Sequence, residues 1–86
     1  MQLQTVEERI REFILKQFPL ARKSGLKSNE KWLETGMIDS LGILDLVHYL
    51  EEEFTLNISD DELQPENFES LEAVVEFVRK KNENKP

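Results

Sequence analysis

The apolar residues of this chain recur at helical spacing in three separate stretches, and no stretch alternates apolar and polar residues as a half-buried strand would. Such stripes give an amphipathic helix one face to bury against its neighbours. The pattern therefore predicts an all-α fold with three main helices. The three stripes are Val6, Ile10, Phe13, Ile14 and Phe18; Ile43, Leu46, Val47, Leu50 and Phe54; and Leu71, Val74, Val75 and Val78.

Signals for helix ends flank each stripe. Residues 5–8 have the T-x-x-E form of a capping box, and Pro19 is expected to end the first helix. The second helix is predicted from near Ser40 to about Phe54, and Ser70 is placed to cap the last. A short helical turn at 65–68 is favoured by the proline that begins it. The prediction is a small four-helix bundle with three main helices and one short helix.

The first two helices are separated by a stretch without periodicity, from about residue 20 to residue 39. We interpret this stretch as a long loop between helices 1 and 2, longer than compact domains usually carry. Isolated apolar residues are expected to fix this loop and the later 55–70 segment to the core. They are Trp32, Leu33, Met37 and Ile38, and then Ile58, Leu63 and Phe68. Residues 1–81 are predicted to form a single domain and 82–86 a frayed tail.

The 86 residues carry 18 acidic and 11 basic side chains, a net charge of −7 that opposes nucleic-acid binding. The chain has no cysteine, so a disulfide framework and a thiol nucleophile are excluded. Neither a signal peptide nor a membrane span is visible, and we expect a cytoplasmic monomer.

Metal and catalytic sites find little support in the sequence. His48 is the only histidine, so a surface histidine is favoured over a metal ligand. A calcium loop beginning at Asn57 fails, because Glu62 stands where glycine is required and Phe68 where the bidentate glutamate is required. A hydrolase is also disfavoured, since no base with an orienting partner accompanies Ser40. We expect no metal site and no catalysis by this chain alone.

Ser40 lies where the long loop gives way to the second helix, in the stretch GMIDSLGIL. Asp39 or Ser40 could simply cap that helix. Alternatively, the positive end of the helix dipole would favour a phosphate esterified to the serine. The two interpretations are compatible, and both stay open at this point.

The stretch LETGMIDSLGILDLVHYLEEEF resembles the modification site and recognition helix of acyl carrier proteins and the related peptidyl carrier domains. The resemblance combines Asp39-Ser40-Leu41 with a preceding Gly36, an acidic run closed by Phe54, and a following I-x-x-x-x-L segment. PENFESLEAVVEFV is similar to the third and fourth helices of free-standing carriers, so the resemblance covers residues 33–79.

The resemblance implies a non-catalytic carrier protein. Ser40, flanked by Asp39 and Leu41, would be esterified to 4'-phosphopantetheine, donated from coenzyme A by a phosphopantetheinyl transferase. The terminal thiol of that group would hold acyl or aminoacyl intermediates as thioesters, which fits the absence of cysteine from the chain.

The outer side of the second helix is the expected docking surface for the transferase and for acyl or aminoacyl ligases and synthases. Exposed leucines flanked by acids would meet basic patches on such partners, although each acid alone could serve solubility. The expected docking residues are Leu41, Leu44, Asp45, His48, Glu51 and Glu52.

Gly42 departs from fatty-acid-type carriers, which commonly have an acidic residue two positions after the serine. This departure favours a specialised carrier, including an aminoacyl or peptidyl carrier loaded by an adenylate-forming ligase. Glycine is also expected to leave the first helical turn adaptable, at about 1 kcal/mol relative to alanine. Fatty acyl, polyketide and aminoacyl cargo all stay open. The alternative from another class of function is an unmodified acidic helical adaptor.

Overall fold

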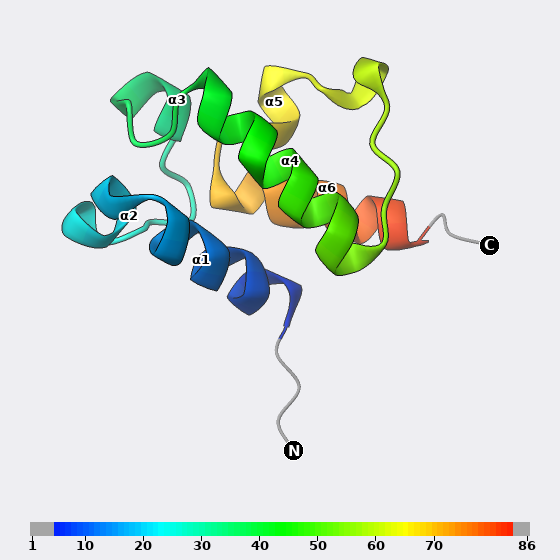
Figure 1. The fold of residues 1–86 in the computed structure, drawn as a ribbon, viewed down its shortest axis with the longest axis horizontal. Helices are drawn as coiled ribbons and strands as arrows, with labels where there is room; N and C mark the ends of the chain where they lie inside the picture. The colour runs from blue at the N-terminus through cyan, green and yellow to red at the C-terminus, as the bar shows by residue number, and fades with distance from the viewer. Residues whose placement is uncertain (1–4, 84–86) are drawn as a thin grey trace.

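The computed structural model describes residues 5–83, and every regular element within that range is a helix (Figure 1). The predicted all-α fold is confirmed, with three main helices and several short ones. The elements are α1 (Val6–Gln17), α2 (Pro19–Ser24), α3 (Trp32–Thr35), α4 (Ser40–Phe54), the 3-10 helix η1 (Asp60–Glu62), α5 (Pro65–Phe68) and α6 (Leu71–Glu83).

The predicted capping box begins α1. The Thr5 N–H donates to Glu8 Oε1 at 3.0 Å, and the Glu8 N–H donates to Thr5 Oγ1 at 3.1 Å. Ser70 caps α6 as expected, because its Oγ accepts from the Ala73 N–H at 3.1 Å. The short helix α5 also spans the residues that the sequence indicated.

The prediction of an irregular loop between the first two main helices is wrong in part, because α2 and α3 lie within it. Pro19 ends α1 and also begins α2, since its fixed backbone angle suits the first turn of a helix. Trp32, fully buried, begins α3 and joins it to the 68–69 segment. Its indole Nε1–H donates to the Phe68 carbonyl at 2.6 Å, and its backbone N–H donates to Glu69 O at 3.0 Å.

The core is built around α6, which packs against α1 and α5, while α2 packs against α1. Figure 1 shows α4 running obliquely across the molecule, with its first turn following α3. The last helix continues to Glu83, two residues beyond the end expected from the sequence, and residues 84–86 lie outside the described part of the chain. The buried apolar side chains are Ile10, Ile14, Ala21, Leu26, Trp32, Met37, Ile38, Leu46, Val47, Leu50, Leu56, Ile58, Phe68, Leu71, Val74, Val75, Phe77 and Val78.

Two leucines expected to anchor the loops do not do so. Leu33 keeps 36% of its surface exposed and Leu63 keeps 39%, whereas Trp32, Ile58 and Phe68 are buried as predicted. Trp32 takes the core position next to Leu33, whereas no residue from 59 to 67, around Leu63, is buried. None of the helices in residues 5–83 combines the length and apolar character needed to cross a membrane.

Candidate functional site

Ser40 is the first residue of α4, and the preceding residue is the cap. Asp39 has extended backbone angles, and its Oδ1 accepts from the Gly42 N–H at 2.8 Å. Ser40 is exposed, and within the described part of the chain no hydrogen bond to its hydroxyl is recorded. Because Asp39 does the capping, the Ser40 oxygen is free for another use.

The first turn of α4 also suits an anion bound at Ser40. The leading N–H groups of a helix have no partner within the helix, and they lie at its positive end. Asp39 takes only the Gly42 N–H, so the backbone N–H groups of Ser40 and Leu41 are left for a neighbouring phosphate. The residues present therefore fit a phosphoester at Ser40.

A mainly apolar cleft of about 210 Å³ opens beside Ser40. It lies between the first turns of α4, α3 and the segment that leads into α5. Leu33 and Leu63, which fail as core anchors, both line it. The lining residues are Leu33, Ser40, Ile43, Leu44, Leu63, Gln64, Pro65 and Phe68. No local sequence pattern predicts this cleft, since its walls come from separate parts of the chain.

Gly42 lies on the inner side of α4, where it is buried. A Cβ added there would stand 2.8 Å from Ile38 Cγ2 and 2.8 Å from Phe18 Cε1, closer than side-chain carbons approach one another. The expectation that Gly42 leaves the first turn adaptable stays a prediction, and the structure gives the glycine a packing role as well. The glycine permits Phe18 to pack closely against α4, and an acidic side chain at this position would have to displace that ring.

The expected docking residues lie on the outer side of α4, and most are exposed. Leu41 is 74% exposed and Leu44 is 56% exposed, and Asp45, His48 and Glu52 are exposed as well. At 3.6 residues per turn, Leu41, Asp45, His48 and Glu52 fall within about 60° of arc, so they form one stripe along the helix.

Glu51 lies at the side of this stripe and is half-buried. Its Oε2 accepts from the Ile58 N–H at 3.0 Å, so that one carboxylate oxygen is already engaged with the loop after α4. A docking role for Glu51 stays a prediction. Its carboxylate also has a structural role, because it bonds the segment that follows α4.

Tyr49 joins α4 to α1, a connection that the sequence analysis did not find. Its ring stacks on Phe13 with centroids 4.1 Å apart, and its hydroxyl donates to the Arg9 carbonyl at 3.0 Å. Burial raises the pKa of the Tyr49 hydroxyl above its ordinary value, the charge of Glu53 adds to this rise, and Arg9 opposes it. The Arg9–Glu53 ion pair, at 2.9 Å, supports the same junction. These contacts fix the helix that carries Ser40.

Within residues 5–83, no three His, Cys, Asp or Glu side chains come together in a way that could hold a metal ion. His48 is exposed on the outer stripe of α4, in agreement with the surface position expected from the sequence. Asp45, His48 and Glu52 also line a hollow between α4 and α1, with Phe13 and Tyr49 among the other residues around it.

The chain is similar to proteins of known type. A family model described as "Phosphopantetheine attachment site" matches residues 8–78. The chain is 32% identical over 75 residues to a protein of Serratia sp. (strain ATCC 39006) named "Probable acyl carrier protein PigG", with 87% of this chain and 86% of that protein covered. It is 29% identical over 80 residues to an "Acyl carrier protein" of Buchnera aphidicola subsp. Acyrthosiphon pisum (strain Tuc7), covering 93% of this chain and 96% of that one.

Proposed function

This chain belongs to the family of proteins with a phosphopantetheine attachment site, and we propose that Ser40 is the residue to which the group is esterified. The chain is a phosphopantetheine-bearing carrier protein of the acyl carrier type, and not an enzyme. The observation that carries the assignment of Ser40 is its exposed hydroxyl, free of hydrogen bonds within residues 5–83, at the first position of a long helix.

The residues around Ser40 have distinct tasks in this proposal. Ser40 supplies the ester oxygen, and the backbone N–H groups at the start of α4 face the phosphate. Asp39 holds the turn by accepting from Gly42, while Leu41 stays exposed for contact with the transferase. When bound, 4'-phosphopantetheine supplies the thiol on which a thioester is carried, and this chain has no cysteine of its own for that purpose.

We propose acyl intermediates as the cargo. The cleft beside Ser40 supports this choice, because its walls are mainly apolar and it opens directly at the proposed attachment residue. The second candidate is aminoacyl or peptidyl cargo loaded by an adenylate-forming ligase. The close packing of Gly42 favours that candidate, since it excludes the acidic side chain typical of fatty-acid-type carriers.

A carrier of this family requires a phosphopantetheinyl transferase and partner enzymes that use the cargo. We propose that these enzymes dock on the outer stripe of α4 through basic surfaces. Leu41 on the stripe and Leu44 beside it supply apolar contacts, and Asp45 and Glu52 supply the charge that attracts such surfaces. A cytoplasmic location is part of the same proposal.

The attachment residue can be tested by intact-mass measurement. The purified apo protein is incubated with coenzyme A and a broad-range phosphopantetheinyl transferase, and the wild type is expected to gain one phosphopantetheine group. Ser40→Ala should gain none. Ser28→Ala is the matched control, because Ser28 is another exposed serine, outside the helices, and its replacement should leave the gain intact.

Two results would contradict the assignment. One is an unchanged wild-type mass beside a carrier that the same transferase modifies, and the other is a full gain of mass in Ser40→Ala. If Ser40→Ala keeps full function in the host while Leu44→Ala loses partner capture, the chain acts as an unmodified acidic adaptor instead.

A further inference from the structure

One wall of the cleft beside Ser40 reaches the hydrophobic core only at its two ends. The chain leaves the core at Ile58 and returns to it at Phe68, and no residue of the intervening 59–67 segment is buried. Leu63, Gln64 and Pro65 from this segment line the cleft. The packing of α5 on α6 through Phe68 holds one end of the wall, and polar contacts hold the part of the segment before α5.

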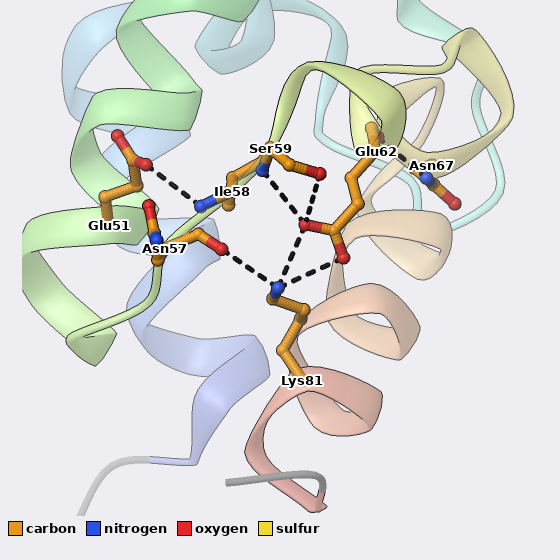
Figure 2. A network of polar contacts seen from close by, with 7 residues as sticks. All are labelled: Glu51, Asn57, Ile58, Ser59, Glu62, Asn67 and Lys81. Atoms are coloured by element: carbon orange, nitrogen blue, oxygen red, sulfur yellow. Dashed lines mark hydrogen bonds and ion pairs between the residues drawn. The ribbon is translucent and has the colours of Figure 1, made fainter.

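Those contacts converge on Glu62, as Figure 2 shows. Lys81, near the end of α6, donates through Nζ to Glu62 Oε1 at 2.9 Å and to Oε2 at 3.0 Å, and also to the Asn57 carbonyl at 2.9 Å. Glu62 Oε1 further accepts from the Ser59 N–H at 3.0 Å and from the Ser59 hydroxyl at 3.2 Å. The ammonium group thus joins Asn57, just before the 59–67 segment, and Glu62, within it, to the last helix.

The same network has two further attachments. The Glu62 carbonyl accepts from Asn67 Nδ2 at 2.8 Å, which connects η1 to α5. The Glu51 carboxylate accepts from the Ile58 N–H at 3.0 Å, which connects the loop to α4. Of these attachments, Lys81 alone brings a positive charge, and the Lys81 and Glu62 side chains keep only 25% and 30% of their surfaces exposed. Charge-assisted hydrogen bonds in such partly shielded positions are stronger than those on an open surface.

We propose that Lys81 is a positioning residue that holds, through Glu62, the wall of the cleft opposite Ser40 and thereby sets how well the cleft shields a carried acyl chain. This inference rests on the proposed function, since it concerns cargo attached near Ser40. It assigns a role in cargo selectivity to a residue of α6 that is not among those lining the cleft. A chain long enough to enter the cleft depends on the wall, and a cargo too short to enter it does not.

Hydrogen exchange on the apo protein tests the positioning. In Lys81→Met, amide exchange within residues 58–63 should quicken by about threefold to tenfold, as expected for loss of a partly exposed charged hydrogen-bonding group. Lys81→Arg should restore most of the protection. Lys80→Met is the matched control, because the neighbouring Lys80 is 70% exposed and forms an ion pair of 4.0 Å with Glu76 on its own helix.

Cargo shielding is measured on the holo protein loaded with either an octanoyl or an acetyl group. Hydroxylamine cleavage of the octanoyl thioester should be about threefold to tenfold faster in Lys81→Met than in the wild type, because the loosened wall shields less. Cleavage of the acetyl thioester should change by less than about twofold, and Lys80→Met should leave both rates unchanged.

Unchanged exchange at 58–63 in Lys81→Met would overturn the positioning role. Faster exchange with equal effects on octanoyl and acetyl cleavage would overturn the role in selectivity. Failure to load Ser40 would contradict the proposed function, and the exchange measurement on the apo protein would still decide whether Lys81 holds the wall. Unfolding in urea, measured on each variant, separates local loosening from global loss of stability.

Discussion

A methyl group added at Gly42 would overlap the Phe18 ring and the Ile38 side chain. Alanine normally stabilises a helix by about 1 kcal/mol relative to glycine, but overpacking a filled site costs about 1–3 kcal/mol. We therefore expect Gly42→Ala to lower the free energy of unfolding by about 1 kcal/mol, the reverse of the effect in an exposed helix. The midpoint of urea unfolding measures this change.

A double-mutant cycle with Phe18→Leu identifies the cause of that loss. A smaller side chain at position 18 should relieve part of the overlap, so the two substitutions together should cost less than the sum of each alone. Additive losses, or a gain in stability from Gly42→Ala, would show that the Phe18 ring does not require glycine at position 42.

Two helical turns begin with a hydroxyl-bearing cap bonded to a glutamate three residues later, at Thr5–Glu8 in α1 and at Ser59–Glu62 in η1. The bond at Thr5 is reciprocal, whereas Glu62 Oε1 accepts from both the N–H and the hydroxyl of Ser59. The backbone bond from Thr5, with its side-chain bond, lowers the pKa of Glu8. The backbone bond from Ser59, followed by the Lys81 side chain, lowers the pKa of Glu62. A carboxyl group whose pKa is lower in the folded protein stabilises the fold above its unfolded pKa, and this stabilisation is lost as the pH falls through the folded pKa.

Both carboxylates should therefore contribute to stability at neutral pH and lose that contribution in acid. We expect Glu8→Gln and Glu62→Gln to reduce the fall in stability between about pH 5 and pH 3, measured by urea unfolding at each pH. Glu83→Gln, which changes an exposed acid at the end of α6, is the control. If all three variants follow the same pH dependence, the two capping contacts do not control acid sensitivity.

The sequence predicted the elements that carry their own local signals. The stripes and caps located α1, α4 and α6, and a single proline located α5. The helices α2 and α3 were missed because they are too short to show periodicity. Trp32 holds α3 through bonds to Phe68 and Glu69, which are distant in sequence. The cleft was missed for the same reason, since Leu33 and Leu63 meet Ser40 only after folding.

For the candidate site, the exposed Leu41, Leu44, Asp45, His48 and Glu52 were predictable from helical spacing around Ser40. The sequence did not predict that Asp39, and not Ser40, caps α4, because either side chain can accept from the first turn. The network that joins Lys81 to Glu62 also gave no sequence signal. Isolated charges in an acidic chain are most simply interpreted as solvated, and their pairing depends on the path of the 55–64 segment.

At the scale of the whole molecule, the net charge of −7 should act on association with basic partners through long-range attraction. Salt screens this attraction over about 8–10 Å at physiological ionic strength, so the rate of loading by the transferase should fall as salt rises. The net charge alone would attract a basic surface to any side of the protein. If partners dock on the outer stripe of α4, the position of each acidic side chain must affect the loading rate, in addition to the net charge of the protein.

Two charge reversals that change the net charge equally separate these effects. Asp45→Lys on the outer stripe of α4 should lower kcat/KM for loading by about tenfold at low salt and should flatten its salt dependence, since it removes an attraction and adds a repulsion at the interface. Glu72→Lys, at an exposed position on α6, should change kcat/KM by less than about threefold, because it alters only the distant field. Equal losses in the two variants would mean that overall charge guides the transferase, and that the outer stripe of α4 does not determine where it docks.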